Sequence, residues 1–142
     1  MTTLRESIVI KRTPQHVFAY LSDFSSCQEW DPGVISAHRT STGPLGVGST
    51  FHVVCALPVG SIELEYEILE FVPDEKLVLV GRSRFFDVTD TITLGESAQG
   101  CELEYTAVFD FNAAVGLMAA SMEAGLQRMG HESVQVGLKA AL

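Results

Sequence analysis

Alternating hydrophobic and polar positions dominate the middle of the chain, from residue 34 to residue 111. They occur in segments of about eight to twelve residues separated by Gly, Pro or Asp, and this spacing is typical of antiparallel strands joined by short turns. The pattern predicts six strands, at residues 34–40, 49–57, 61–72, 76–84, 86–94 and 101–111.

The alternation is most regular in the strands at 61–72 and 101–111. Between positions 62 and 68 every even-numbered residue is apolar and every odd-numbered residue is a glutamate. In the last strand the odd positions from 103 to 109 are apolar, whereas Glu102 and Glu104 occupy even positions. Because successive side chains point to opposite faces of a sheet, one face should meet water and the other must be covered.

The N-terminal segment predicts one more strand and two helices. Residues 6–11 have the pattern of a short strand, and Thr13 followed by Pro14 is a helix start, with a hydroxyl N-cap and proline at the first helical position. Apolar residues then recur at helical spacing, which indicates a helix with one apolar side. Residues 25–30 form at most one further turn, because Asp31-Pro32-Gly33 is typical of a turn.

The segment after Phe111 is the only long element left to cover the sheet, and we predict a C-terminal helix there. At 100° per residue, an inward stripe within about 60° of one meridian is expected, formed by Met118, Ala119, Met122, Leu126, Met129, Ser133, Val136, Gly137 and Ala140. Four glycines interrupt this helix, each costing up to about 1 kcal/mol relative to alanine. Close approach of the helix to the sheet would offset that cost, and so would space for a molecule bound beneath the helix.

Composition agrees with one globular domain spanning residues 1–142. Apolar residues make up 46% of the chain and charged residues 19%, so neither disorder nor a coiled coil fits. A chain of this length can bury a core without a metal or a disulfide. The formal net charge of -9 repels phosphate backbones and anionic headgroups, so we do not expect nucleic acid as a partner.

The cysteines and the N-terminus indicate a cytoplasmic protein. Cys27, Cys55 and Cys101 are odd in number and lack the spacing of a zinc site, so we expect reduced thiols and no metal. The N-terminus lacks the apolar run of an export signal. The longest weakly polar stretch, residues 113–122, is about half of the roughly 20 residues that cross a bilayer, so we expect no membrane span.

Three stretches carry a family resemblance. The first covers residues 10–24 and is followed by Glu29-Trp30-Asp31-Pro32, the second covers 43–51 and is followed by a turn at 70–77, and the third covers 126–138. Together they resemble the SRPBCC superfamily, which includes START domains, birch-pollen-type allergens and polyketide cyclase/dehydrase-like proteins. Most of these positions are turn and core residues, so they indicate fold more than activity.

The resemblance implies an α+β helix-grip fold, in which a curved seven-stranded antiparallel sheet wraps around a long C-terminal helix. The implied element order is strand, two helices, six strands and a helix. It also implies an elongated apolar pocket between sheet and helix that takes lipids, sterols, polyketides or other hydrophobic small molecules, without a cofactor. Met118, Met122 and Met129 on the predicted stripe would then line this pocket with adaptable surface.

Asp90 is the most informative ionisable residue, since the chain has no motif of a serine hydrolase, a zinc protease or a nucleotide-binding site. In the strand at 86–94 it shares one side with Val88 and Ile92. If that side faces inward, Asp90 is a carboxyl group with a raised pKa that can act as general acid, general base or hydrogen-bond donor. A hydrogen-bonded structural aspartate is the alternative.

Aromatic residues complete the predicted ligand site. Tyr66 and Tyr105 lie on the inward sides of their strands, where each hydroxyl could meet a ligand oxygen, although plain core packing is the alternative. Phe51 and Phe109 lie on the bulky sides of their strands. Trp30 falls where the family has its pocket mouth, with packing beneath the first helix as the alternative.

These observations leave three functions open. The favoured one is a carrier or sensor, monomeric or homodimeric, that binds a hydrophobic small molecule in the cavity. The second is an enzyme of the polyketide cyclase or dehydratase type, in which Asp90 with Tyr66 or Tyr105 moves protons. The third is a protein-binding module, which would combine a filled interior with a large exposed apolar patch.

Overall fold

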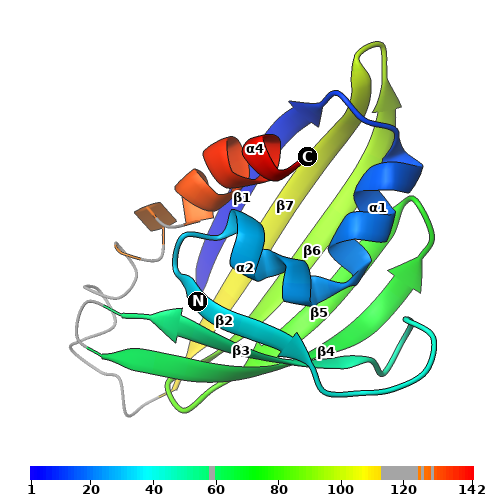
Figure 1. Cartoon of the computed structure of the whole chain (residues 1–142). Helices are drawn as coiled ribbons and strands as arrows, with labels where there is room; N and C mark the ends of the chain where they lie inside the picture. The colour runs from blue at the N-terminus through cyan, green and yellow to red at the C-terminus, as the bar shows by residue number, and fades with distance from the viewer. Residues whose placement is uncertain (58–59, 113–124, 126, 129) are drawn as a thin grey trace.

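The computed structural model describes residues 1–57, 60–112, 125, 127–128 and 130–142. Within them, one antiparallel sheet has the strand order β1-β7-β6-β5-β4-β3-β2, with β2 to β7 in sequence order and β1 paired with β7 (Figure 1). The strands are β1 (Thr2–Ile10), β2 (Val34–Arg39), β3 (Thr50–Ala56), β4 (Ser61–Val72), β5 (Lys76–Arg82), β6 (Phe86–Ser97) and β7 (Gly100–Phe111).

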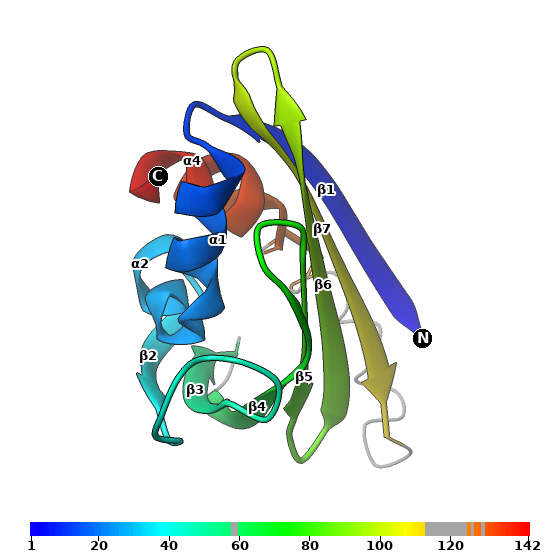
Figure 2. The same ribbon diagram turned by 90° about the vertical axis from the view of Figure 1, so that its right-hand side faces the viewer.

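The helical segments all lie on one side of the sheet, inside its curve, as Figure 2 shows. They are α1 (Pro14–Ser22), η1 (Phe24–Ser26), α2 (Cys27–Trp30), the π-helical η3 (Ser133–Leu138) and α4 (Lys139–Ala141). The predicted α+β class, a curved antiparallel sheet with a C-terminal helix, is therefore confirmed. No helix in the described ranges has the length and apolar character needed to cross a membrane.

Local sequence explains where α1 begins and what it covers. The Thr13 side chain accepts a hydrogen bond from the backbone N–H of His16, and Pro14 occupies the first turn. The apolar side of α1 is buried, and its Phe18 meets Phe71 of β4 edge to face with ring centroids 5.1 Å apart. A register shift between Ile68 and Glu70 of β4 precedes this contact, and such a bulge re-aims the residues that follow it.

The strand predictions are correct in number and close in position. The strand at 61–72 has the predicted bounds, whereas β1 begins at Thr2 instead of residue 6. The early residues of β1 alternate only weakly in polarity, but each pairs with β7, from Thr2 opposite Phe109 to Ile10 opposite Cys101. Long-range pairing therefore extends this strand beyond the segment that its own sequence marks.

The predicted inward stripe of the C-terminal helix is partly wrong. Ser133 is buried as expected, but Val136 is 65% exposed and Ala140 is exposed, while Val134 and Leu138 are buried in their place. The reason is the π-helical turn from Ser133 to Leu138. Such a turn has i→i+5 hydrogen bonds, so the assumed 100° per residue fails across it. Met118, Met122, Leu126 and Met129 lie outside the described residues.

Two of the helix glycines are explained by close approach. A Cβ atom at Gly130 would lie 2.7 Å from Leu4 Cδ1, and one at Gly137 would lie 1.7 Å from the carbonyl oxygen of Trp30. Among the described residues, nothing lies within 4 Å of the Cβ position of Gly125, and Gly116 lies outside the described residues. The helix therefore needs glycine at 137 because it packs directly on the backbone of α2.

We predict that Gly137→Ala destabilises the protein by about 1–3 kcal/mol, the usual cost of forcing extra atoms into a packed contact. The free energy of unfolding from urea denaturation measures this change. Gly125→Ala is the matched control, because it adds the same methyl group in open space and should be neutral or stabilising by up to about 1 kcal/mol. Equal effects at the two positions would contradict the packing explanation.

Candidate functional site

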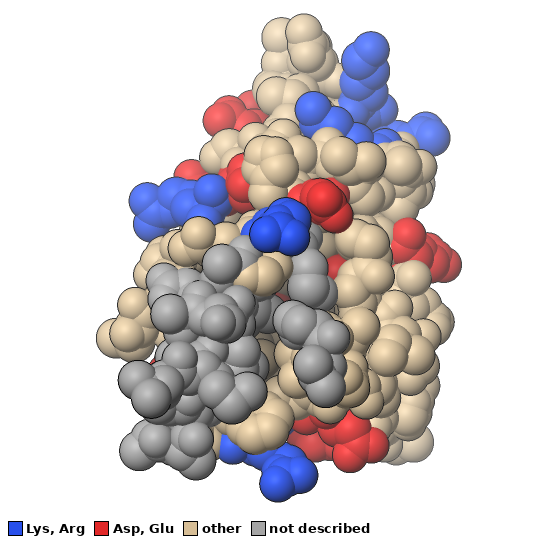
Figure 3. All heavy atoms as spheres, turned by 90° about the vertical axis from the view of Figure 1, so that its left-hand side faces the viewer, with Lys and Arg blue, Asp and Glu red and all other residues tan. Residues whose placement is uncertain are grey.

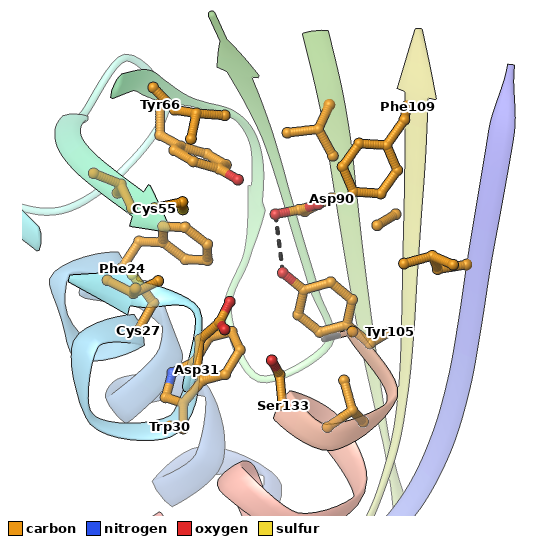
Figure 4. A pocket seen from close by; sticks show the side chains of 18 of the residues that line it. Phe24, Cys27, Trp30, Asp31, Cys55, Tyr66, Asp90, Tyr105, Phe109 and Ser133 are labelled. Atoms are coloured by element: carbon orange, nitrogen blue, oxygen red, sulfur yellow. Dashed lines mark hydrogen bonds between the residues drawn. The ribbon is translucent and has the colours of Figure 1, made fainter. Parts of the chain in front are cut away.

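A cavity of about 110 Å³ lies between the inner face of the sheet and the helical segments. Most of its wall is apolar, with side chains from η1, α2, β3, β4, β6, β7 and η3 (Figure 4). Pockets for drug-sized ligands measure roughly 300–1,000 Å³, whereas an apolar cavity of about 150 Å³ accepts benzene. The described cavity therefore suits a guest with one ring or a short chain.

Asp90 of β6 places a carboxyl group inside this apolar space. Its side chain is 3% exposed, and the Tyr105 hydroxyl of β7 donates a hydrogen bond to Asp90 Oδ2 at 2.9 Å. Figure 4 shows the Tyr66 hydroxyl, the Asp31 carboxylate and the Ser133 hydroxyl directed toward the same space. Five polar side chains from different elements thus converge in a cavity whose wall is mostly apolar.

Asp31 is positioned by the turn that ends α2. Its Oδ1 accepts a hydrogen bond from the backbone N–H of Gly33 at 2.9 Å, the local contact for which Asp is favoured in turns. The Ser133 hydroxyl of η3 lies near the same carboxylate and favours its charged form. Asp31 and Ser133 thus bring the α2 turn and η3 together at the wall of the cavity.

Burial raises the pKa of Asp90 to about 7, because an apolar environment disfavours the charged form. Hydrogen bonds from Tyr105 and Tyr66 oppose this rise, while the nearby Asp31 carboxylate adds to it. Burial also raises the pKa of Asp31, against the hydrogen bonds from Gly33 and Ser133. Near neutral pH, Asp90 is thus present in both its acid and its carboxylate form.

The two phenols remain hydrogen-bond donors at neutral pH. Burial, and then the adjacent Asp90 carboxylate, raise the pKa of Tyr66 and of Tyr105 well above the usual value. Tyr66 owes its position to Gly81 on the neighbouring strand, because a Cβ atom at Gly81 would lie 2.6 Å from Tyr66 Cζ. The ring therefore lies over a strand position that has no side chain.

Aromatic contacts connect the cavity wall. The Phe24 ring lies 4.7 Å from Tyr66, 6.2 Å from Trp30 and 6.3 Å from Phe51, measured between centroids. The Trp30 ring in turn meets Tyr105 edge to face at 6.1 Å. Edge-to-face and tilted pairs at these separations are favourable beyond their buried area, so the aromatic wall holds the phenols in place.

Two cysteines also face the cavity but remain thiols. Burial raises the pKa of the Cys55 thiol to about 12, and it raises the pKa of Cys27 further. Protonated thiols are poor nucleophiles and poor metal ligands. Within the part of the chain that the structure describes, no group of three or more His, Cys, Asp or Glu could hold a metal ion.

The structure brings together most of the described residues singled out from the sequence. Asp90, Trp30, Tyr66, Tyr105 and Phe109 all line the cavity. Phe51 does not line it, although it is fully buried, because it packs behind the wall against Phe24. The candidates Met118, Met122 and Met129 lie outside the described residues.

Sequence reasoning missed Asp31, Ser133, Phe24 and Gly81 as site residues. Asp31 has a sequence signal, but its place before Pro32 and Gly33 marks a turn and gives no sign of a cavity. Gly81 has a clearer signal, since glycine inside a strand often marks a close approach. Nothing local distinguishes Ser133 or Phe24 from other residues on the inner side of a helical segment.

A family model described as "Polyketide cyclase / dehydrase and lipid transport" matches residues 1–140. No curated protein matches the sequence. Among solved structures, TTHA0849 from Thermus thermophilus has a TM-score of 0.80 at 15% identity, over 97% of this chain and 94% of that one. The Zhui aromatase/cyclase from Streptomyces sp. R1128 has a TM-score of 0.80 at 13% identity, over 98% and 92% of the two chains. At these identities the likeness concerns the fold.

We predict that Asp90 makes stability fall as pH rises. Its pKa is about 7 in the folded state and about 3.9 in the unfolded state, so between these values the folded protein binds more protons and loses stability with rising pH. Relative to Asp90→Asn, the wild type should lose about 2–3 kcal/mol of unfolding free energy between about pH 5 and about pH 8.

Denaturant unfolding of both proteins at several pH values measures this difference. Asp87→Asn is the matched control, since Asp87 lies on the same strand but is exposed, and it should follow the wild type. Parallel curves for the wild type and Asp90→Asn would mean that Asp90 is ionised in the fold across this range.

Proposed function

Because the chain belongs to the polyketide cyclase/dehydrase and lipid transport family, we propose that it is a carrier or sensor that binds a small, largely apolar molecule beside Asp90. The observation that carries this proposal is the convergence of the Asp90 carboxyl and two phenol groups in a largely apolar cavity. Apolar walls with a few convergent polar groups are the usual composition of a ligand pocket.

The free-energy cost of burying Asp90 also supports a ligand-binding role over a purely structural one. A buried carboxyl with a raised pKa costs free energy at neutral pH, and an apolar residue would fill the same place without that cost. The space beside it is bounded by the sheet and the helical segments. An apolar guest with one polar group would occupy this space and hydrogen-bond to Asp90 or Tyr66. The proposal includes a cytoplasmic location, which agrees with three free cysteines.

An enzyme is the second candidate, and the pKa of Asp90 at about 7 favours it. A group that is half protonated at neutral pH is well suited to general acid–base catalysis. In the dehydration of a β-hydroxy ketone, the Asp90 carboxylate would take the proton next to the carbonyl. It would then return that proton to the departing hydroxyl, so that water leaves and a carbon–carbon double bond forms.

We predict that wild-type protein binds 2-phenylethanol and that Ala107→Leu abolishes this binding. Ala107 is buried, lies directly opposite Asp90 across the β6–β7 pair and lines the cavity, so a larger side chain there removes the space for a guest. Trp30 is the only tryptophan and also lines the cavity, so its fluorescence reports the binding.

The control is Ala19→Leu, which adds the same atoms at an exposed position of α1 and should leave binding unchanged. Filling a cavity commonly stabilises a fold by about 0.5–2 kcal/mol, so Ala107→Leu should remain folded in thermal denaturation. Equal binding by the wild type and a folded Ala107→Leu variant would place the guest elsewhere and overturn the proposal.

The enzymatic candidate predicts turnover of 4-hydroxy-4-methylpentan-2-one, a short β-hydroxy ketone, to the conjugated enone. Asp90→Asn should lower that rate by about 10²–10⁴-fold, the usual contribution of a general acid–base group, while it keeps 2-phenylethanol binding. Ultraviolet absorbance of the enone measures the reaction, and Asp87→Asn is the control. A rate that is the same in Asp90→Asn as in the wild type would remove Asp90 from catalysis.

A further inference from the structure

The ionisable groups on the cavity wall that carry charge are all acids. Glu6 of β1, Asp31 after α2 and Asp90 of β6 line it, whereas none of its described lining residues is Lys, Arg or His. The sequence adds no base from the segment before Gln127, since residues 113–126 contain no Lys, Arg or His. A guest in this cavity therefore meets carboxylates and no compensating cation.

Glu6 differs from the other two acids because it has a histidine and a glutamine as partners outside the cavity. His131 Nδ1 lies 2.7 Å from Glu6 Oε1, and Gln135 Nε2 donates to Glu6 Oε2 at 2.9 Å. Burial acts to raise the pKa of Glu6, but these hydrogen bonds outweigh it and lower the pKa. Glu6 is thus satisfied within the fold, where it ties β1 to the C-terminal helix.

Among the described residues, Asp31 and Asp90 have only neutral hydrogen-bond donors. The backbone N–H of Gly33 donates to Asp31, and the Tyr105 hydroxyl donates to Asp90. Neither residue takes part in an ion pair within the described ranges. Each carboxylate also raises the free energy of the other's charged form, and a cation between them would relieve this repulsion.

Aromatic rings stand beside these carboxylates on the cavity wall. The site therefore combines acidic groups with aromatic and apolar surface. Trp30 and Tyr105 lie edge to face at 6.1 Å, and Phe24 and Tyr66 lie at 4.7 Å, on the walls next to Asp31 and Asp90. The faces of such rings attract ammonium groups, most strongly where water is excluded. Carboxylates and aromatic rings around a largely apolar space are complementary to an amine on an apolar body.

The protein surface does not reproduce this arrangement. On the face in Figure 3, acidic and basic side chains are interspersed, and exposed glutamates elsewhere pair with bases, as in Arg82–Glu67 and Lys76–Glu70. We propose that the cavity selects a small guest with a protonated amine on an apolar body, held between Asp31 and Asp90, over alcohols and acids of the same shape. This inference rests on the proposed binding function and narrows its ligand class.

The selection should depend on pH through Asp90. Tyr105 from β7, Tyr66 from β4, Cys55 from β3, Cys27 from α2 and Asp31 from the following turn surround it. The phenols and thiols have raised pKa values and stay neutral, so Asp90, with a pKa of about 7, is the group on this wall that titrates near neutrality. An alkylamine keeps its proton up to about pH 10. Its affinity should therefore rise between about pH 6 and about pH 8 as Asp90 ionises.

The test compares 2-phenylethylamine, 2-phenylethanol and phenylacetate, which share one ring and chain length and differ in the charge of the terminal group. At about pH 8 we expect the amine to bind at least about tenfold more tightly than the alcohol, and the acid at least about tenfold more weakly. Trp30 fluorescence and isothermal titration calorimetry give the three dissociation constants.

Asparagine substitutions then test which residues are responsible for the preference for the amine. Asp90→Asn and Asp31→Asn should each bring the amine-to-alcohol ratio to within about threefold of one while alcohol binding persists. Asp87→Asn removes an exposed acid from β6 and should keep the full ratio. The persistence of alcohol binding shows that a variant is folded, so a lost preference cannot be ascribed to unfolding.

The other possible results distinguish a failure of the amine selectivity from a failure of the binding function. An acid or alcohol that binds as tightly as the amine would overturn the amine selectivity and leave cavity binding intact. A preference for the amine that survives both aspartate substitutions would overturn its assignment to these residues. If none of the three compounds binds, the proposed binding function fails together with this inference.

Discussion

The fold depends on one constraint, which is that a single layer of helical segments must shield the inner face of a seven-stranded sheet from water. Among the described residues, α1 and α2 amount to nine and four, and η3 and α4 add six and three at the other end. The sheet compensates by curving around these segments (Figure 2). Where helical segments and sheet cannot meet, a space remains, and its walls come from elements that are far apart in sequence.

Asp90 shows what this space implies for stability. The strand pairing places its carboxyl opposite Ala107 and next to Tyr105, so a phenol, and no base of the described residues, donates a hydrogen bond to it. The arrangement preserves hydrogen bonding but leaves ionisation unfavourable. A buried acid of this type lowers the stability of the ligand-free protein when it ionises. A ligand that pairs with the carboxylate removes this cost, so the complex is stabilised.

Much of the fold could be predicted from the sequence because its strands alternate in polarity and are punctuated by turns. The alternation of apolar and polar residues along their strands is enough to place Asp90, Tyr66 and Tyr105 on the inner face of the sheet. Three features could not be predicted in this way. The first residues of β1 are held by β7, the bulge in β4 inserts a residue, and the π-helical turn shifts the phase of the last helix. Asp31 reaches the site through a tertiary contact with Ser133, and no local pattern encodes that contact.

The contact between Gly137 and the Trp30 carbonyl oxygen has a mechanical consequence. With no side chain between them, the backbones of α2 and the C-terminal helix are in direct contact, and Asp31 and Ser133 line the cavity beside this contact. A displacement of either segment is therefore transmitted to the other. Access to the interior from this side would require both segments to move away from the sheet together.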